Sequence, residues 1–262
     1  MREVRRKQME ALIAKQQTLS MEALCEAFGV SMNTVRADVA YLVKTGAVQK
    51  VYGGVRAVSH QEVPLFTQRA TQHPDAKRQI ARRAEALVQD GDVIYIDAGT
   101  TTMHLMDFLD SAKHITVLTG NLSAIAQASA KANVELILLP GVLNRRTNSV
   151  VDGSTLEFLA RYQCSKAFMG VSGVSEDGRL CVSTYAEYEL KKLAVQRSQM
   201  AYLLVDSSKF GGAGLMSYGT LADMTQIITD SGCPDGIRQL CAAKDIDLTV
   251  LPEPNRKENI HV

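Results

Sequence analysis

The feature that most constrains this chain is a very short break between two amphipathic segments near its beginning. An apolar stripe within residues 21–28 predicts a short helix that Ser20 can cap and that Gly29 can end in a left-handed conformation. Only Val30 and Ser31 separate this helix from the next stripe, formed by Val35, Val39, Leu42 and Val43. Two helices joined by so tight a turn, with glycine in it, are typical of the helix-turn-helix motif.

The segments on either side of this motif complete a small domain. Residues 2–16 carry an i, i+3, i+4 apolar pattern that predicts a preceding helix. Gly46 ends the third helix, and Gly53-Gly54 joins two β-prone runs at residues 48–52 and 55–58, which predicts a hairpin. A hairpin directly after the third helix is a wing. The sequence therefore predicts a winged helix-turn-helix domain over residues 1–58.

The exposed face of the third helix suits nucleic acid. At about 100° per residue, short polar and long cationic side chains lie opposite the apolar stripe. The former can reach base edges in the major groove and the latter can reach phosphates. The candidates on this helix and the wing are Asn33, Thr34, Arg36, Lys44, Lys50 and Arg56. An ordinary solvated helix face is the alternative for the helix alone, and the following wing favours DNA.

Charge and composition agree with a small DNA-binding head on a larger body. Residues 1–60 hold nine Lys and Arg against five Asp and Glu, whereas the remainder holds twenty against twenty-three. Positive charge gathered in a small domain is attracted to a phosphate backbone. Five scattered cysteines without a C-x-x-C pair argue against a disulfide framework or a zinc cluster. No signal peptide or membrane span is evident, so we expect a cytoplasmic protein. We also expect no metal and no cofactor.

From Asp92 onward, apolar runs alternate with amphipathic stretches. The runs that predict strands lie at residues 93–96, 115–118, 135–139, 167–171, 201–205, 226–229 and 247–250. Helical stretches separate most of them, which predicts an α/β domain over residues 77–252 with a mostly parallel sheet. Residues 59–76 lack periodicity and contain two prolines, which predicts a linker, and residues 253–262 read as a flexible tail.

Ligands of such sheets bind at the carboxyl ends of the strands, where this chain has several polar loops. In the first loop, Asp97 to Thr102, Gly99 lets the backbone turn closely and three threonines offer hydroxyls beside unpaired helix N–H groups, an arrangement that binds anions. A plain threonine cap is the alternative. Further candidates in later loops and on one later helix are Asn121, Arg145, Glu187, Lys191 and Lys209. Singly, a surface charge, a salt bridge or a turn would explain each of them, but together they favour a binding site.

The motifs of both parts resemble the DeoR family of bacterial repressors of sugar and polyol operons, over nearly the whole chain. They are S31-M-N-T-V-R-A-D-V, G46-A-V-Q-K-V-Y-G-G54, D97-A-G-T-T-T102, T119-G-N-L122, E187-Y-E-L-K191 and D206-S-S-K-F-G211. The resemblance implies a sensor domain similar in fold to ribose-5-phosphate isomerase. It also implies a phosphorylated sugar or polyol effector that weakens binding to operator DNA, and self-association as a dimer or tetramer.

The resemblance also assigns residues. Ser31, Thr34 and Arg36 would contact DNA, and Asp38 would brace the helix. The residues that would line or support the effector site are Asp97, Gly99, Thr100, Thr101, Asn121, Arg145, Glu187, Lys191 and Lys209, and the loop itself adds Thr102 as a candidate. Three departures from the family pattern, at Ala37, Gly120 and Pro140, bear on the operator sequence and on the identity of the effector.

Two alternatives remain open at this point. The same fold could act as an activator or sense an unphosphorylated ligand. A sugar-phosphate isomerase with a DNA-binding head would need a positioned acid/base pair. The chain lacks the Asp-Gly-Ala-Asp-Glu and Lys-Gly-Gly segments of the isomerases that its body resembles, so we expect no catalytic residues.

Overall fold

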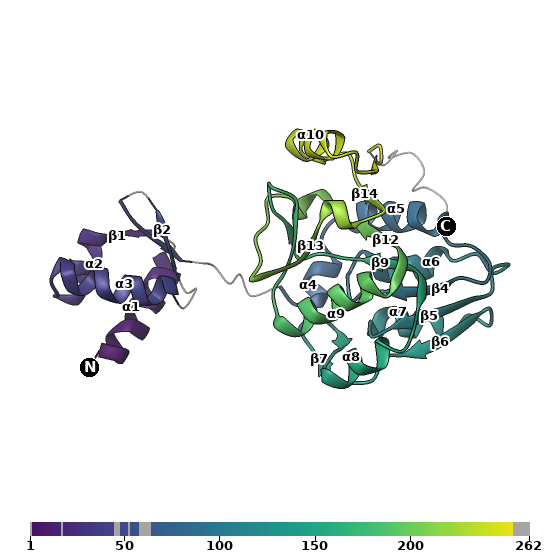
Figure 1. Ribbon diagram of the computed structural model, residues 1–262, viewed down its shortest axis with the longest axis horizontal. Coiled ribbons are helices and arrows are strands. Elements are labelled where there is room, and N and C mark those ends of the chain that lie inside the picture. The colour runs from purple at the N-terminus through teal and green to yellow at the C-terminus, as the bar shows by residue number, and fades with distance from the viewer. Residues whose placement is uncertain (1, 17, 45–47, 52, 58–63, 254–262) are drawn as a thin grey trace. The chain divides into compact units, whose positions relative to one another are not determined.

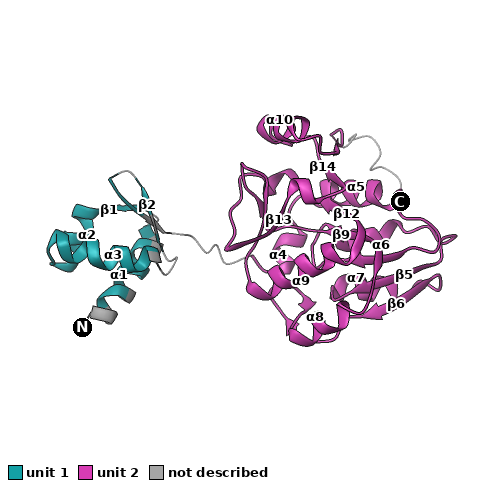
Figure 2. Ribbon diagram, in the orientation of Figure 1, with its two compact units in different colours: residues 1–62 teal, residues 63–262 magenta. Residues whose placement is uncertain are grey.

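The computed structural model describes residues 2–16, 18–44, 48–51, 53–57 and 64–253. The chain forms two compact units, residues 1–62 and residues 63–262 (Figures 1 and 2). Gly46, the predicted domain boundary at residue 58, the first residues of the predicted linker and nearly all of the predicted tail lie outside the described residues.

The first unit is the predicted winged helix-turn-helix. Its helices are α1 (Arg2–Gln16), α2 (Met21–Phe28) and α3 (Met32–Lys44), and its sheet has the order β1 (Thr18–Ser20), β3 (Gly54–Ala57), β2 (Val48–Val51). The caps are as expected: the Ala23 N–H donates to Ser20 Oγ at 3.1 Å, and Gly29 has a φ of 59°. The short strand β1 was not predicted, because three residues carry too little pattern.

One carboxylate ties helix α3 to helix α1. Asp38 in α3 has no exposed surface, and its two oxygens each accept a 2.8 Å hydrogen bond, one from Arg5 Nε and one from Arg6 Nε. Burial alone would raise the pKa of Asp38, but the two arginines outweigh it and hold that pKa below its ordinary value. Asp38 thus braces the helix.

The second unit is built on the predicted parallel sheet. Seven strands lie in the order β15-β14-β12-β9-β4-β5-β6, and each pairing between neighbours is parallel. The bounds are β4 (Val93–Ile96), β5 (Ile115–Thr119), β6 (Val134–Leu138), β9 (Cys164–Met169), β12 (Ser198–Leu204), β14 (Gln226–Thr229) and β15 (Leu248–Val250). The chain runs outward from β4 to β6 on one side and from β9 to β15 on the other. The order therefore reverses between β4 and β9, where the carboxyl ends of strands form a binding crevice in such sheets.

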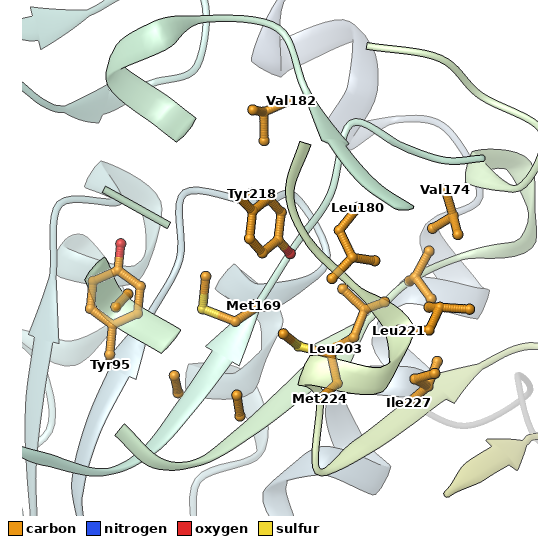
Figure 3. Packing of buried hydrophobic residues seen from close by; sticks show 14 of the residues in the cluster. Tyr95, Met169, Val174, Leu180, Val182, Leu203, Tyr218, Leu221, Met224 and Ile227 are labelled. Atoms are coloured by element: carbon orange, nitrogen blue, oxygen red, sulfur yellow. The ribbon is translucent and has the colours of Figure 1, made fainter. Parts of the chain in front are cut away.

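Helices cover both faces of this sheet (Figure 1). One face packs against α5 (Pro74–Glu85), α6 (Leu105–Phe108) and α7 (Leu122–Ala128), and the other packs against α8 (Gly153–Leu159), α9 (Tyr185–Gln196) and α10 (Asp235–Ala243). Side chains alternate between the two cores, as the pleat requires: Ile94 and Ile96 join the first, whereas Tyr95 joins the second (Figure 3). No helix in the described part of the chain is long and apolar enough to cross a membrane.

Two small sheets lie beside the main one. An antiparallel sheet has the order β10 (Gly173–Val174), β11 (Arg179–Val182), β13 (Met216–Thr220), and a hairpin pairs β7 (Leu143–Asn144) with β8 (Ser149–Val150). Tyr218 of β13 and Leu180 of β11 project into the core shown in Figure 3. Neither sheet was predicted, since strands of two to five residues show little periodicity.

The second half of the predicted linker is structured and belongs to the second unit. It forms α4 (Phe66–Ala70), and α5 begins at Pro74 rather than at Lys77. Phe66 is buried and its N–H donates to the Arg146 carbonyl at 2.8 Å. A five-residue helix is too short to show an apolar stripe, so its position depends on these tertiary contacts.

A buried ion pair holds the amino-terminal end of the sheet. Lys166 Nζ lies 2.5 Å from Asp92 Oδ2, and the Ser165 hydroxyl donates to Asp92 Oδ1 at 2.8 Å. Burial would raise the pKa of Asp92, but these donors and the Gln89 N–H outweigh it and lower that pKa. Asp92 therefore stabilises the fold only while it is ionised.

We predict that Asp92→Asn lowers the free energy of unfolding of the second unit by about 3–5 kcal/mol, because it leaves Lys166 charged and unpaired in the core. Thermal and urea unfolding of the full chain measure the effect, with exposed Glu157→Gln as the matched control. In the wild type, the stabilisation from Asp92 should persist above its ordinary pKa of 3.8 and disappear as pH falls through its lower folded-state pKa. Equal stability of the two variants at neutral pH would contradict this account.

Candidate DNA-binding face and effector site

The predicted DNA contacts gather at the amino-terminal end of α3. Ser31, Asn33 and Arg36 are exposed and Thr34 is half-buried. Ser31 Oγ accepts from the Thr34 N–H at 3.4 Å and lies 3.0 Å from the Thr34 hydroxyl, so these two side chains also cap the helix. Ala37, one of the departures from the family pattern, is exposed beside Arg36.

The wing contributes to the same surface. Arg36 of α3 and Lys50 of β2 line one groove together with Met21, Glu22, Met32, Val39, Val51, Gly53 and Gly54. Gly54 is required where β3 meets β1, because a β-carbon there would lie 2.3 Å from the Leu19 carbonyl oxygen. The side chains of Lys44 and Arg56 lie outside the described residues. One cation of α3 and one of the wing therefore line the same groove.

In the second unit, Asp97 lies at the point where the strand order reverses. It directly follows β4 and is only 2% exposed. Asp97 Oδ2 accepts a 2.8 Å hydrogen bond from the N–H of Gly170, the residue that follows β9, and it forms an ion pair with Lys191 of α9. One carboxylate oxygen thus joins two strands and a helix.

The Gly170 carbonyl completes this cluster. It accepts from Lys191 Nζ at 3.1 Å and from the Tyr218 hydroxyl at 3.1 Å. Burial and then the nearby Asp97 raise the pKa of Tyr218, so its hydroxyl stays protonated and donates. A β-carbon at Gly170 would lie only 3.1 Å from Asp97 Oδ2, so glycine leaves room for this carboxylate at the end of β9. The predicted Asp97 and Lys191 are therefore brought together.

The three threonines of the first loop divide into two kinds. The Thr102 hydroxyl donates to the Asp97 carbonyl at 2.7 Å and accepts from the Gly99 N–H at 3.1 Å, so it is used within the loop. Thr100 and Thr101 are also nearly buried. Within residues 64–253, however, their hydroxyls have no hydrogen-bond partner. Thr102 shapes the loop, and the other two offer free hydroxyls to a ligand.

Asn121 holds the loop that begins at Asp97. Its Nδ2 donates to the carbonyls of Asp97 and Gly99 at 3.1 and 3.2 Å. Its Oδ1 accepts from the N–H groups of Ser123 and Ala124 and so caps α7. Since its amide is fully used by the protein, Asn121 positions the loop, and a ligand contact would have to replace one of these bonds.

A second charged cluster follows β12. Asp206 is 1% exposed and its Oδ2 is buried without a hydrogen-bond partner among the described residues. Lys77 of α5 is equally buried and donates to the Arg69 carbonyl at 2.5 Å. Burial lowers the pKa of Lys77 to about 8; nearby Asp206 opposes this shift, and Lys209 and Arg69 add to it. Lys209, a predicted residue, belongs to this cluster.

Two predicted residues are placed differently. Glu187 is half-buried near the start of α9, where it accepts from the Thr184 hydroxyl at 3.1 Å and interacts electrostatically with Arg69. Arg145 is exposed in the turn between β7 and β8, and within residues 64–253 no hydrogen bond or ion pair ties it to Asp97. Glu187 therefore belongs to the edge of the site, and Arg145 is not brought into it.

Sequence reasoning missed several residues of this site. Arg69 and Lys77 lie in or next to the segment assigned to the linker, and neither Gly170 nor Tyr218 belongs to a motif that was singled out. Asp206 opens the motif from which only Lys209 was chosen. The sequence signal that could have pointed to Arg69 and Lys77 is that these two cationic residues lie eight positions apart, shortly before the first strand of the main sheet.

Comparisons with known proteins agree with this architecture. The DeoR-like helix-turn-helix domain model matches residues 5–61, and the DeoR C terminal sensor domain model matches residues 72–231. The HTH-type transcriptional regulator IolR of Bacillus subtilis is 38% identical over 95% of this chain and 99% of its own length. The glycerol-3-phosphate regulon repressor of Escherichia coli is 28% identical over 90% of this chain and 94% of its own.

Solved structures resemble parts of the chain more distantly. Ribose 5-phosphate isomerase A of Methanocaldococcus jannaschii has a TM-score of 0.39 and 20% identity, and the match covers 53% of this chain and 55% of the isomerase. The eIF2B beta of Chaetomium thermophilum has a TM-score of 0.42 and 18% identity, covering 59% and 48%. The two domain matches and the full-length relatives are decisive: the chain belongs to the DeoR family and is a DNA-binding regulator of transcription rather than an enzyme.

Proposed function

We propose that this protein represses a sugar or polyol catabolic operon, and that a phosphorylated sugar or polyol releases it from operator DNA. The observation that carries the proposal is the set of four cationic side chains at the carboxyl edge of the sheet, Arg69, Lys77, Lys191 and Lys209. The relative named as the glycerol-3-phosphate regulon repressor supports the choice of ligand class.

The free polar groups of the site suit such a ligand. Thr100 and Thr101 offer hydroxyl donors on a glycine-containing loop, and Lys209 has no partner among residues 64–253, so all three are available to a phosphate. The buried, unpartnered Oδ2 of Asp206 can accept a hydrogen bond from a sugar hydroxyl. A ligand that carries both an anion and a hydroxyl would satisfy both halves of the site.

The experiment that tests this proposal compares free and phosphorylated forms of the same sugars and polyols. Operator affinity is measured by fluorescence anisotropy and the stability of the sensor unit by thermal unfolding. We expect one phosphorylated compound to raise the operator dissociation constant about 5–150-fold, while its free counterpart does nothing. A response to the free compound alone would favour the unphosphorylated alternative. A reporter that falls when the gene is deleted would favour an activator.

The loop threonines provide a matched pair of variants. Thr101→Val should weaken binding of the phosphorylated compound about tenfold and leave the unfolding temperature nearly unchanged, because its hydroxyl has no partner in the protein. Thr102→Val should instead lower the free energy of unfolding by about 1–3 kcal/mol, because the Asp97 carbonyl and the Gly99 N–H lose a buried partner. Titration calorimetry and thermal unfolding separate the two effects. Similar effects of both variants on stability would argue against this division.

The DNA face makes a separate prediction. Arg36→Gln should weaken operator binding, and if Arg36 contacts a phosphate, the slope of log affinity against log salt should become shallower by about 0.9. Anisotropy titrations over a range of potassium chloride concentrations measure both quantities. Arg161→Gln, an exposed arginine of the second unit, is the control. An unchanged slope together with altered sequence preference would assign Arg36 to a base rather than to the backbone.

A further inference from the structure

Helix α4 is the first element of the second unit, and its contacts anchor it there. The Phe66 side chain is buried and its N–H donates to the Arg146 carbonyl at 2.8 Å. The chain enters this helix at Pro64, two residues after the first unit ends at Glu62. The described residues of the second unit therefore begin directly before α4.

Arg69 of α4 holds that segment with one side of its guanidinium group. Its Nε donates to the Pro64 carbonyl at 3.0 Å, while its own carbonyl accepts from Lys77 Nζ at 2.5 Å. Through these bonds Arg69 connects the entering chain with the buried Lys77, which interacts electrostatically with Asp206 and Lys209. The residue thus joins the first residues of the unit to the second charged cluster.

The guanidinium group also lies over the Phe66 ring, 5.7 Å from its centroid, but its other side has no hydrogen-bond partner among the described residues. Arg69 Nη2 is buried, and no hydrogen bond to it is formed within the described residues. Burial lowers the pKa of Arg69, and the nearby carboxylates of Glu187 and Asp97 oppose this shift. A buried N–H without an acceptor is rare and costly, and an oxygen of a bound anion would satisfy it.

We propose that Arg69 couples the effector site to the DNA-binding unit: its free Nη2 binds an oxygen of the anionic group of the effector while its Nε holds the carbonyl of Pro64. Guanidinium geometry allows both bonds at once, because its N–H groups point in different directions within one rigid plane. A bound anion would fix Arg69, and with it the position of the chain that enters α4. This inference rests on the proposed function and assigns its regulation to one residue.

The variants that test it separate charge from geometry. Arg69→Lys keeps a positive charge but cannot hold Pro64 and an anion in the same way, whereas Arg69→Gln removes the charge. Exposed Arg82→Gln in α5 is the matched control. The probes are inorganic phosphate and glycerol 3-phosphate, each compared with potassium chloride at equal ionic strength. The readouts on the full chain are thermal unfolding, operator affinity and hydrogen exchange of residues 64–70.

In the wild type and in Arg82→Gln, we expect a probe to raise the unfolding temperature, slow hydrogen exchange in residues 64–70 and weaken operator binding. Arg69→Lys should still be stabilised by the probe, but its operator affinity should change less than about twofold, below the range usual for coupled sites. Arg69→Gln should lose both responses. If Arg69 had only a structural role, both variants would be less stable than the wild type, but neither would bind the probe without a change in operator affinity.

Two results would overturn the inference, and they differ from failure of the proposed function. Suppose that a probe stabilises the wild type and weakens its operator binding, and that Arg69→Lys and Arg69→Gln both respond as the wild type does. Arg69 is then not the coupling residue, and the proposed function stands. Unchanged exchange of residues 64–70 in a wild type that the probe stabilises would also exclude it. If neither these probes nor any compound of the panel affects the wild type, the proposed function fails and this inference with it.

Discussion

The sensor unit depends on one buried carboxylate, that of Asp97. It accepts from the Gly170 N–H and pairs with Lys191, so it joins the ends of β4 and β9 to helix α9. A buried charge of this kind is tolerated only with its partners in place, because removing one of them leaves the other unpaired in a medium of low dielectric constant. The backbone carbonyl of the same residue accepts from Thr102 and Asn121, the two side chains that shape and position the loop. Stability and site geometry therefore come from the same few atoms.

The DNA-binding unit uses a similar device for a different purpose. Asp38 takes up both Arg5 and Arg6, two of the four basic residues near the amino terminus. These arginines raise the net charge of the head, but they are engaged in holding α1 against α3. The positive charge available to DNA is consequently smaller than the composition indicates. Arg36 and Lys50, by contrast, line the groove between α3 and the wing.

Local chemistry made part of this structure predictable and left another part hidden. Caps such as Ser20 and Gly29, and the seven strands of the main sheet, depend on neighbouring residues and on apolar runs, so the sequence reveals them. The role of Asn121 was less accessible, because only the folded loop shows that its amide is saturated by Asp97, Gly99 and α7. Arg69 and Lys77 were missed for the same reason: the charged groups that they interact with electrostatically, such as Asp97 and Asp206, lie far along the chain. Short strands such as those of the antiparallel sheet are fixed by pairing across about forty residues rather than by their own pattern.

The anchoring of α4 has a practical consequence for where this protein can be divided. A fragment that starts at Lys77, as the alternating pattern of the body would suggest, omits Phe66 from its buried site and Arg69 from its position beside the charged clusters. Its Lys77 would also lose the carbonyl to which it donates. A fragment that starts at Val63 keeps all three interactions and matches the boundary between the compact units. The second unit thus begins fourteen residues before its first predicted helix, so part of the segment that the sequence assigns to a linker belongs to the packed unit.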